Sequence, residues 1–175
     1  TTSFSNPSGD RLCTLLKSKK TLLIPGTFDA LSALIAKQAG FEALYLSGFS
    51  VSGSMLAKPD IGLVTASEMT ERARQIVAAV GDTPLIADGD NGYGSEHDVA
   101  RLVNAFEQAG VQSIQLEDQV SPKRCGHMDK KQVVTLEEAV SKIGMAVRSR
   151  QSKEFLIMAR TDSRATHGLD EALRR

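Results

Sequence analysis

The sequence predicts an α/β fold, a (β/α)8 TIM-type barrel of which this chain supplies about the first five strand-helix units. Short apolar runs alternate five times with segments of helical periodicity, and strands joined by helices run parallel. Polar residues end the second to fifth runs, which favours a barrel because all its strands end at one shared mouth. The first run lacks the phosphate-binding glycine fingerprint that would favour an open, doubly wound sheet.

The element boundaries follow from apolar periodicity and from capping signals. Asp29 and Ser95 are expected helix caps, and Thr65 and Thr135 each precede a glutamate at the spacing of a capping box. In chain order the expected elements are helix 10–20, strand 21–28, helix 30–38, strand 41–48, an irregular link 49–64, helix 66–80, strand 84–90, helix 96–108, strand 111–118, a link 119–134, helix 136–150, strand 154–162 and the start of a helix at 169–175.

Length and composition indicate one ordinary globular domain. The 175 residues, 41% of them hydrophobic and 24% charged, suffice for a sizeable core. Lys plus Arg and Asp plus Glu balance at 21 each, so no nucleic-acid or anionic-membrane partner is expected. The apolar runs are too short to cross a membrane and residues 1–10 lack a signal-peptide core, so we expect a cytoplasmic location. The two cysteines lack metal-ligand spacing, and Cys13 is expected to pack in a helix.

The predicted strands are too few for a closed barrel, which needs eight. We therefore expect residues 1–175 to form a single domain that is the N-terminal part of a barrel, incomplete at its C-terminus. Five strands alone would leave two unpaired parallel edges, which favour aggregation.

Asp88 and Asp90 follow the apolar run of the third predicted strand. Because residues two apart in a strand point the same way, the two carboxylates are expected to share one small space. Such a pair needs a compensating cation, and oxygen ligands suit a hard ion such as Mg²⁺ or Mn²⁺. The alternative is that both are ordinary loop carboxylates that cap the next helix.

Two further side chains are candidates for chemistry. Cys125 lies among Lys123, Arg124 and His127, an electropositive setting that favours a thiolate, and the alternative is a packed cysteine. Arg160 ends the fifth predicted strand, where its guanidinium could bind a carboxylate by two parallel hydrogen bonds. An isolated arginine is more often a surface ion-pair partner, but a position at the same mouth as the acids favours the binding role.

Five segments carry a resemblance to a known family. They read ALYLSG at 43–48, ADGDNGYG at 87–94, LEDQ at 116–119, KRCGH at 123–127 and MARTD at 158–162. In this combination and order the chain resembles the isocitrate lyase/phosphoenolpyruvate mutase superfamily over nearly its whole length. The cysteine-containing segment, together with the residues that follow the fifth strand, resembles the lyase branch, that of 2-methylisocitrate lyase and the petal death protein.

The resemblance assigns roles to individual residues. It implies a Mg²⁺ ion, with Mn²⁺ as a possible substitute, held near Glu117, and a tetramer as the assembly. It also implies that His127 orients the loop or the substrate, while Tyr45 and Asp60 keep the alternative of a structural role. The implied set is catalytic Cys125, Arg160, Glu117, Tyr45 and His127; substrate-binding Ser47, Gly48, Phe49, Asp60, Lys123, Gly126 and Arg160; and metal-binding Asp88 and Asp90.

The implied activity is cleavage of a carbon-carbon bond in a 2-hydroxy di- or tricarboxylate of the 2-methylisocitrate or 2-alkylmalate type. A retro-aldol (retro-Claisen) route releases a 2-keto acid and leaves a carbanion, which Cys125 protonates while Arg160 stabilises its negative oxygens. The base that removes the hydroxyl proton stays open between Tyr45 and a hydroxide at the metal. Two alternatives are an oxaloacetate or phosphonopyruvate hydrolase or decarboxylase, and an inactive truncated barrel that acts as an interaction partner.

Overall fold

The structure, a computed structural model, describes residues 7–18 and 21–175. The last two residues of the helix expected at 10–20 therefore lie outside the described residues. The elements are, in order, α1 (Pro7–Lys17), β1 (Gly26–Thr27), α2 (Ala30–Gln38), β2 (Leu44–Leu46), α3 (Gly48–Leu56), α4 (Ala66–Val80), β3 (Leu85–Asp88), α5 (Glu96–Gln108), β4 (Ser113–Glu117), α6 (Leu136–Ser149), β5 (Leu156–Arg160), α7 (Ser163–His167) and α8 (Leu169–Arg174).

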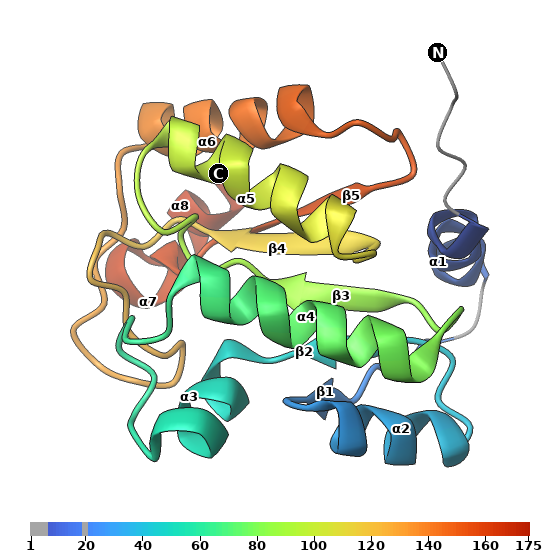
Figure 1. Cartoon of the computed structure of the whole chain (residues 1–175). Helices are drawn as coiled ribbons and strands as arrows, with labels where there is room; N and C mark the ends of the chain where they lie inside the picture. Colours follow the sequence, from blue (N-terminus) through green and yellow to red (C-terminus); the bar gives the residue numbers. More distant parts are fainter. Residues whose placement is uncertain (1–6, 19–20) are drawn as a thin grey trace.

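A five-stranded parallel sheet organises these elements (Figure 1). The strand order is β1-β2-β3-β4-β5, so each strand pairs in parallel with the next one along the chain. A doubly wound sheet instead reverses its strand order at a switch point. The sequential order is that of a barrel wall, and the predicted fold class is confirmed for the five units present.

Four helices form the outer layer of this wall. Neighbouring pairs along α2, α4, α5 and α6 contact one another, and Figure 1 shows the row of helices along the sheet. Phe106 and Phe155 are fully buried in the core between the helices and the strands. On the other side of the sheet, Leu12 of α1 packs with Ala43 and Ile86, where it covers residues near the strand starts. The C-terminal ends of the strands are left open for a site.

Loops and short helices gather where the strands end. Figure 1 shows α3, α7, α8 and the segment between β4 and α6 at this end of the sheet, opposite α1. We call residues 121–131, the middle of that segment, the flap. Within the described residues, no helix combines the length and apolarity that crossing a bilayer requires.

The sequence-based boundaries agree with the structure within one residue for α2, α4, α5, α6 and α8, whereas α1 begins three residues earlier than expected and each strand is shorter than its predicted run. The strand expected at 21–28 is reduced to β1, because only Gly26 and Thr27 pair with β2. The link expected at 49–64 contains the helix α3, whose glycine and serine residues obscured the apolar period. Ser47 caps α3 by accepting the N–H of Ser50 at 3.3 Å. The short helix α7 was likewise not predicted.

Candidate active site

A cavity of about 530 Å³ opens where the strands end. All the predicted site residues line it except Gly48 and Asp90, whose backbone N–H groups donate to the lining residue Asp88. Three residues without a predicted role, Pro59, Arg124 and Met128, also border it. The lining consists of Tyr45, Ser47, Phe49, Pro59, Asp60, Asp88, Glu117, Lys123, Arg124, Cys125, Gly126, His127, Met128 and Arg160.

Asp88 and Asp90 lie close together, but not because residues two apart in a strand point the same way. The strand β3 ends at Asp88, and Asp90 has a φ of 47°, in the left-handed region, so the chain turns between them. The N–H of Asp90 donates to Asp88 Oδ1 at 3.1 Å. A Cβ added at Gly48 would lie 3.0 Å from Asp88 Oδ2 and 3.4 Å from Asp90 Oδ1, so both carboxylates face the start of α3. The alternation argument is therefore wrong for Asp90, while the expected proximity is present.

Lys123 of the flap lies between two buried acids. Its Nζ is 2.6 Å from Asp90 Oδ1 and also contacts Asp60 Oδ1. Burial alone would lower the pKa of Lys123, but the charges and hydrogen bonds of the two aspartates more than offset it and raise the pKa. Burial and the charge of Asp88 raise the pKa of Asp90, which Lys123 opposes. Lys123 thus places a positive charge against Asp60 and Asp90, and this charge offsets part of the cost of burying the two carboxylates.

Glu117 and Arg160 are neighbours across the ends of β4 and β5. The strand register pairs them directly, and Arg160 Nη1 lies 3.6 Å from Glu117 Oε2. Burial raises the pKa of Glu117 to about 8, with the two nearby aspartates adding to the effect and Arg160 opposing it. In the absence of a bound cation, this carboxyl group is consequently protonated near neutral pH.

The flap brings a thiol and an imidazole over the cavity. Cys125 is buried, its N–H donates to the carbonyl of Asp60 at 2.9 Å, and its Sγ lies 3.7 Å from His127 Nδ1. Gly126 rests against the guanidinium of Arg160, because a Cβ at this position would overlap Arg160 Nη2. The predicted cysteine, histidine and arginine therefore lie together at one wall of the cavity.

Tyr45 lies on the floor of the same cavity. Gln115 Nε2 donates to its hydroxyl oxygen at 3.1 Å. Burial, followed by the charge of Asp88, raises the pKa of Tyr45 well above its ordinary value. The phenol consequently keeps its proton near neutral pH and is available as a hydrogen-bond donor.

The donor set suits a hard cation. Glu117 Oε1 is buried and has no hydrogen-bond partner in the structure, so it can accept a further donor or coordinate an ion. Asp88 and Asp90 supply carboxylate oxygens nearby, and Mg²⁺ characteristically keeps several waters and takes only one or two carboxylates. Across 7–18 and 21–175, no cluster of three or more acidic, histidine or cysteine side chains is arranged as a complete ligand set. The residues present therefore fit a water-rich Mg²⁺ ion.

Three residues that received no predicted role secure the flap. Gln119 is buried and donates from Nε2 to the carbonyl of Arg124 at 2.9 Å and to Asp162 Oδ2 at 3.1 Å. Lys131 Nζ donates to Asp162 Oδ1 at 3.2 Å. Gln119 and Asp162 belong to the LEDQ and MARTD segments, which was the available sequence signal.

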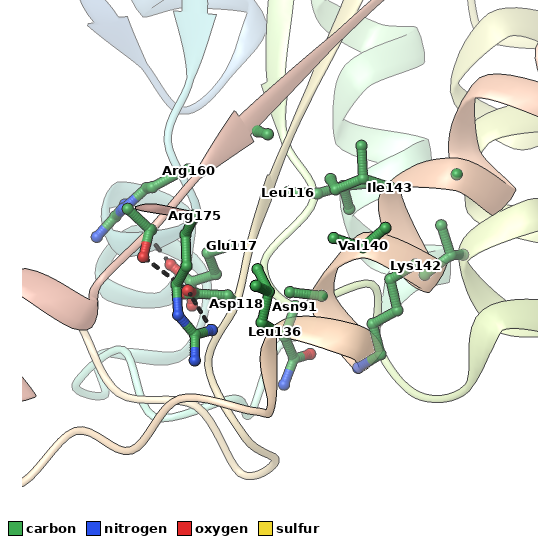
Figure 2. A pocket seen from close by; sticks show the side chains of 15 residues that line it. Asn91, Leu116, Glu117, Asp118, Leu136, Val140, Lys142, Ile143, Arg160 and Arg175 are labelled. Carbon is green, nitrogen blue, oxygen red and sulfur yellow. Dashed lines mark hydrogen bonds and ion pairs between the residues drawn. The ribbon is translucent and has the colours of Figure 1, made fainter. Parts of the chain in front are cut away.

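A second cavity, of about 370 Å³, lies beside the first, between α6 and the end of β5 (Figure 2). Leu136, Val140 and Ile143 form a largely apolar wall, and Arg175 donates to Asp118 Oδ2 at 3.0 Å. Glu117 and Arg160 border both cavities, but the thiol and Asp88 line the first one only. We therefore assign the candidate active site to the larger cavity.

Comparison with known proteins gives consistent matches along the chain. The sequence model of the phosphoenolpyruvate phosphomutase family matches residues 12–175. The chain is 50% identical to the 2,3-dimethylmalate lyase of Eubacterium barkeri over 161 residues, which is 92% of this chain and 55% of that protein. It is 44% identical to the petal death protein of Dianthus caryophyllus over 161 residues, 92% of this chain and 51% of that protein. The chain thus spans about half the length of these curated relatives.

Solved structures agree with the sequence matches. A crystal structure of 2,3-dimethylmalate lyase superposes with a TM-score of 0.92 at 36% identity, covering 98% of this chain and 57% of that one. Oxaloacetate acetylhydrolase bound to the inhibitor 3,3-difluorooxalacetate gives 0.92 at 35%, covering 96% and 58%. Phosphonopyruvate hydrolase in complex with oxalate and Mg²⁺ gives 0.87 at 34%, covering 95% and 57%.

Proposed function

The chain belongs to the phosphoenolpyruvate phosphomutase family, within the isocitrate lyase superfamily, and we propose that the native protein is a Mg²⁺-dependent carbon-carbon lyase. Its substrate is a 2-hydroxy di- or tricarboxylate of the 2-alkylmalate or 2-methylisocitrate type, and its products are a 2-keto acid and a carboxylate. A cytoplasmic tetramer stays a prediction for the assembly and location.

One observation carries this proposal. A buried thiol, an arginine and the carboxylate of Asp88, to which Asp90 is hydrogen-bonded, line the same cavity, although they come from the flap, from β5 and from β3. This combination supplies what the reaction needs, namely a proton donor, a cation for negative oxygens and oxygen ligands for a metal. The 50% identity to a 2,3-dimethylmalate lyase supports substituted malates in particular.

Different residues of the site have different roles in metal binding and substrate binding. Asp88 and Asp90 would hold the metal, with Glu117 beside them, and a bound Mg²⁺ ion would supply Lewis-acid chemistry at this end of the cavity. At the start of α3 the N–H of Gly48 donates to Asp88 Oδ2 and that of Ser50 to Ser47 Oγ, so the N–H of Phe49 and the hydroxyl of Ser47 are the donors for the carboxylate of the 2-keto acid. Tyr45 adds a hydroxyl donor at the floor.

The bond-breaking step leaves an electron pair on the departing carboxylate fragment. Once a base has accepted the hydroxyl proton, the carbon-carbon bond breaks, a carbonyl forms and the electron pair of the broken bond becomes a carboxylate-stabilised carbanion. Arg160 binds the negative oxygens of this fragment, and the thiol of Cys125 gives its proton to the carbon. His127, 3.7 Å from the sulfur, orients the thiol and stabilises the thiolate that results.

A Cys125→Ser variant tests the assignment. In the native protein we expect turnover of 2-alkylmalates and 2-methylisocitrate to fall by about two orders of magnitude or more, as for the loss of a general acid, while Mg²⁺ binding stays unchanged. Cys13→Ser, a change in α1 at the opposite end of the sheet, is the matched control and should retain activity. An active Cys125→Ser variant would contradict the role of the thiol.

A hydrolase is the second candidate, because oxaloacetate acetylhydrolase superposes as well as the lyase does, with a TM-score of 0.92. The two functions differ in their products. Incubating the native protein with oxaloacetate, phosphonopyruvate and a series of 2-alkylmalates, and identifying the products by mass, separates them. Oxalate or phosphate without any 2-keto acid from the malates would overturn the lyase assignment.

A further inference from the structure

Asp162 directly precedes the helix α7, a position typical of a capping residue, but its side chain does not cap that helix. It is the N-cap residue of α7, yet its carboxylate makes no capping hydrogen bond. The side chain is buried, with 7% of its surface exposed. Because burying a carboxylate is costly unless it is paired and hydrogen-bonded, its contacts identify what it stabilises.

Those contacts come from three separate parts of the molecule. Asp162 Oδ1 accepts from Arg160 Nη2 and from Lys131 Nζ, both at 3.2 Å. Asp162 Oδ2 accepts from Gln119 Nε2 at 3.1 Å. Its backbone N–H donates to Asp118 Oδ1 at 2.9 Å, which fixes the main chain beneath the carboxylate. A single anion therefore joins β5, the end of β4 and the flap.

The flap and Arg160 depend on each other sterically as well. Lys131 also donates to the carbonyl of Gly126, the glycine that rests against the guanidinium of Arg160. If Arg160 left its present rotamer, the surface on which Gly126 rests would change. If the flap moved away, Arg160 would lose that cover while keeping Asp162 and Glu117 as partners.

We propose that Asp162 is a positioning residue that holds Arg160 and the flap in one common arrangement, so that the cavity closes only when Arg160 is oriented toward the substrate carboxylate. This inference rests on the proposed function, in which Arg160 binds the substrate and the flap carries Cys125. In this proposal the Asp162 carboxylate couples substrate binding by Arg160 to the position of the proton donor Cys125.

Asp162→Asn in the native protein is the direct test, with Lys131→Met as the variant that affects the flap alone. Lys130→Met is the matched control, because Lys130 is the exposed neighbour. Asp162→Asn should lower kcat/KM by about tenfold or more, by a raised KM together with a lowered kcat. Lys131→Met should lower kcat with little change in KM, and Lys130→Met should leave both unchanged.

Two readouts need no turnover. Oxalate binding in the presence of Mg²⁺, measured by calorimetry, should weaken about tenfold in Asp162→Asn and stay unchanged in Lys131→Met. Trypsin cleavage after the exposed Arg124 should be faster in both variants than in the native protein. Oxalate with Mg²⁺ should slow that cleavage in the native protein and in Lys130→Met, but not in Asp162→Asn.

The double variant Asp162→Asn/Lys131→Met separates coupling from general loosening. Because the contact between Lys131 and Asp162 is lost in either single variant, the two changes should raise the cleavage rate less than additively in the double variant. Additive effects, or native oxalate affinity and cleavage in Asp162→Asn, would overturn the proposal. If Asp162→Asn does not fold, Lys131→Met is the deciding variant, because an unchanged rate of trypsin cleavage in it would overturn the proposed link between Asp162 and the flap. A native protein that turns over none of the 2-hydroxy acids overturns the lyase function and leaves these two readouts intact.

Discussion

Lys123 Nζ lies 2.6 Å from Asp90 Oδ1, so a lysine of the flap neutralises one of the two carboxylates assigned to the metal. The same ammonium contacts Asp60, which precedes the helix α4 and lies beside Asp90. The flap is thus attached to the acid pair by charge at one end and to Asp162 through Lys131 at the other. Four predictions follow from these attachments and from the burial of Glu117.

Lys123→Met should destabilise the metal-free protein. The change leaves Asp60 and Asp90 buried without their cation, and breaking a buried ion pair by removing one partner costs about 3–5 kcal/mol. Added Mg²⁺ should restore part of the lost free energy of unfolding, because it returns positive charge beside Asp90. Urea unfolding in chelator and in Mg²⁺ measures both quantities, with Lys130→Met as control. Equal stability of Lys123→Met and the native protein in chelator would contradict the buried pair.

The stability of the metal-free protein should fall as the pH rises from about 4.5 to about 8. Burial raises the pKa of Glu117 from 4.5 to about 8, so in this window the folded state keeps a proton that the unfolded state has lost. The contribution is fully present below the unfolded pKa and is lost as the pH rises through the folded pKa, by up to about 1.4 kcal/mol per pH unit. Glu117→Gln should remove this slope, and the difference between the two urea-unfolding curves isolates it. Parallel pH profiles would show that Glu117 does not titrate in this way.

Binding of Mg²⁺ should release protons near pH 7. A cation beside Glu117 and Asp90 favours their ionised forms, while burial raises the pKa of both in its absence. Calorimetry in two buffers of different ionisation enthalpy should therefore give different heats at pH 7 and the same heat above about pH 9. Identical heats at pH 7 would be incompatible with a protonated Glu117 next to the ion.

Gly126→Ala should damage activity without unfolding the protein. The added Cβ would overlap Arg160 Nη2, so the arginine or the flap must move. We expect kcat/KM to fall about tenfold or more, as for misplacing a substrate-binding group. Gly144→Ala in α6 is a control of the same chemistry, because its Cβ would meet the flexible end of Arg148 at 3.1 Å. That change should leave activity intact and stabilise the helix by about 0.5–1 kcal/mol. Native activity in Gly126→Ala would mean that the contact with Arg160 is dispensable.

The sequence by itself determined the parallel alternation of strands and helices, the starts of α2, α4, α5, α6 and α8, and most of the residues that line the cavity. These features are local: periodicity places apolar faces, and Thr65 with Glu68 forms the expected capping box through side chains that lie close along the chain. Asp88, Glu117 and Arg160 could be placed at one mouth because parallel strands end on the same side of the sheet.

Only the tertiary structure decided how those residues pair. The ion pairs of Lys123 and the contacts of Asp162 with Gln119 and Lys131 join segments that are distant in sequence, and their geometry depends on strand register and on the path of the flap. The helix α3 was hidden for a related reason: its residues have weak helix propensity, and burial of Val51 and Ser52 against the rest of the chain stabilises it. Local propensity thus fixes which side chains reach the mouth of the barrel, whereas long-range packing fixes which of them are neighbours.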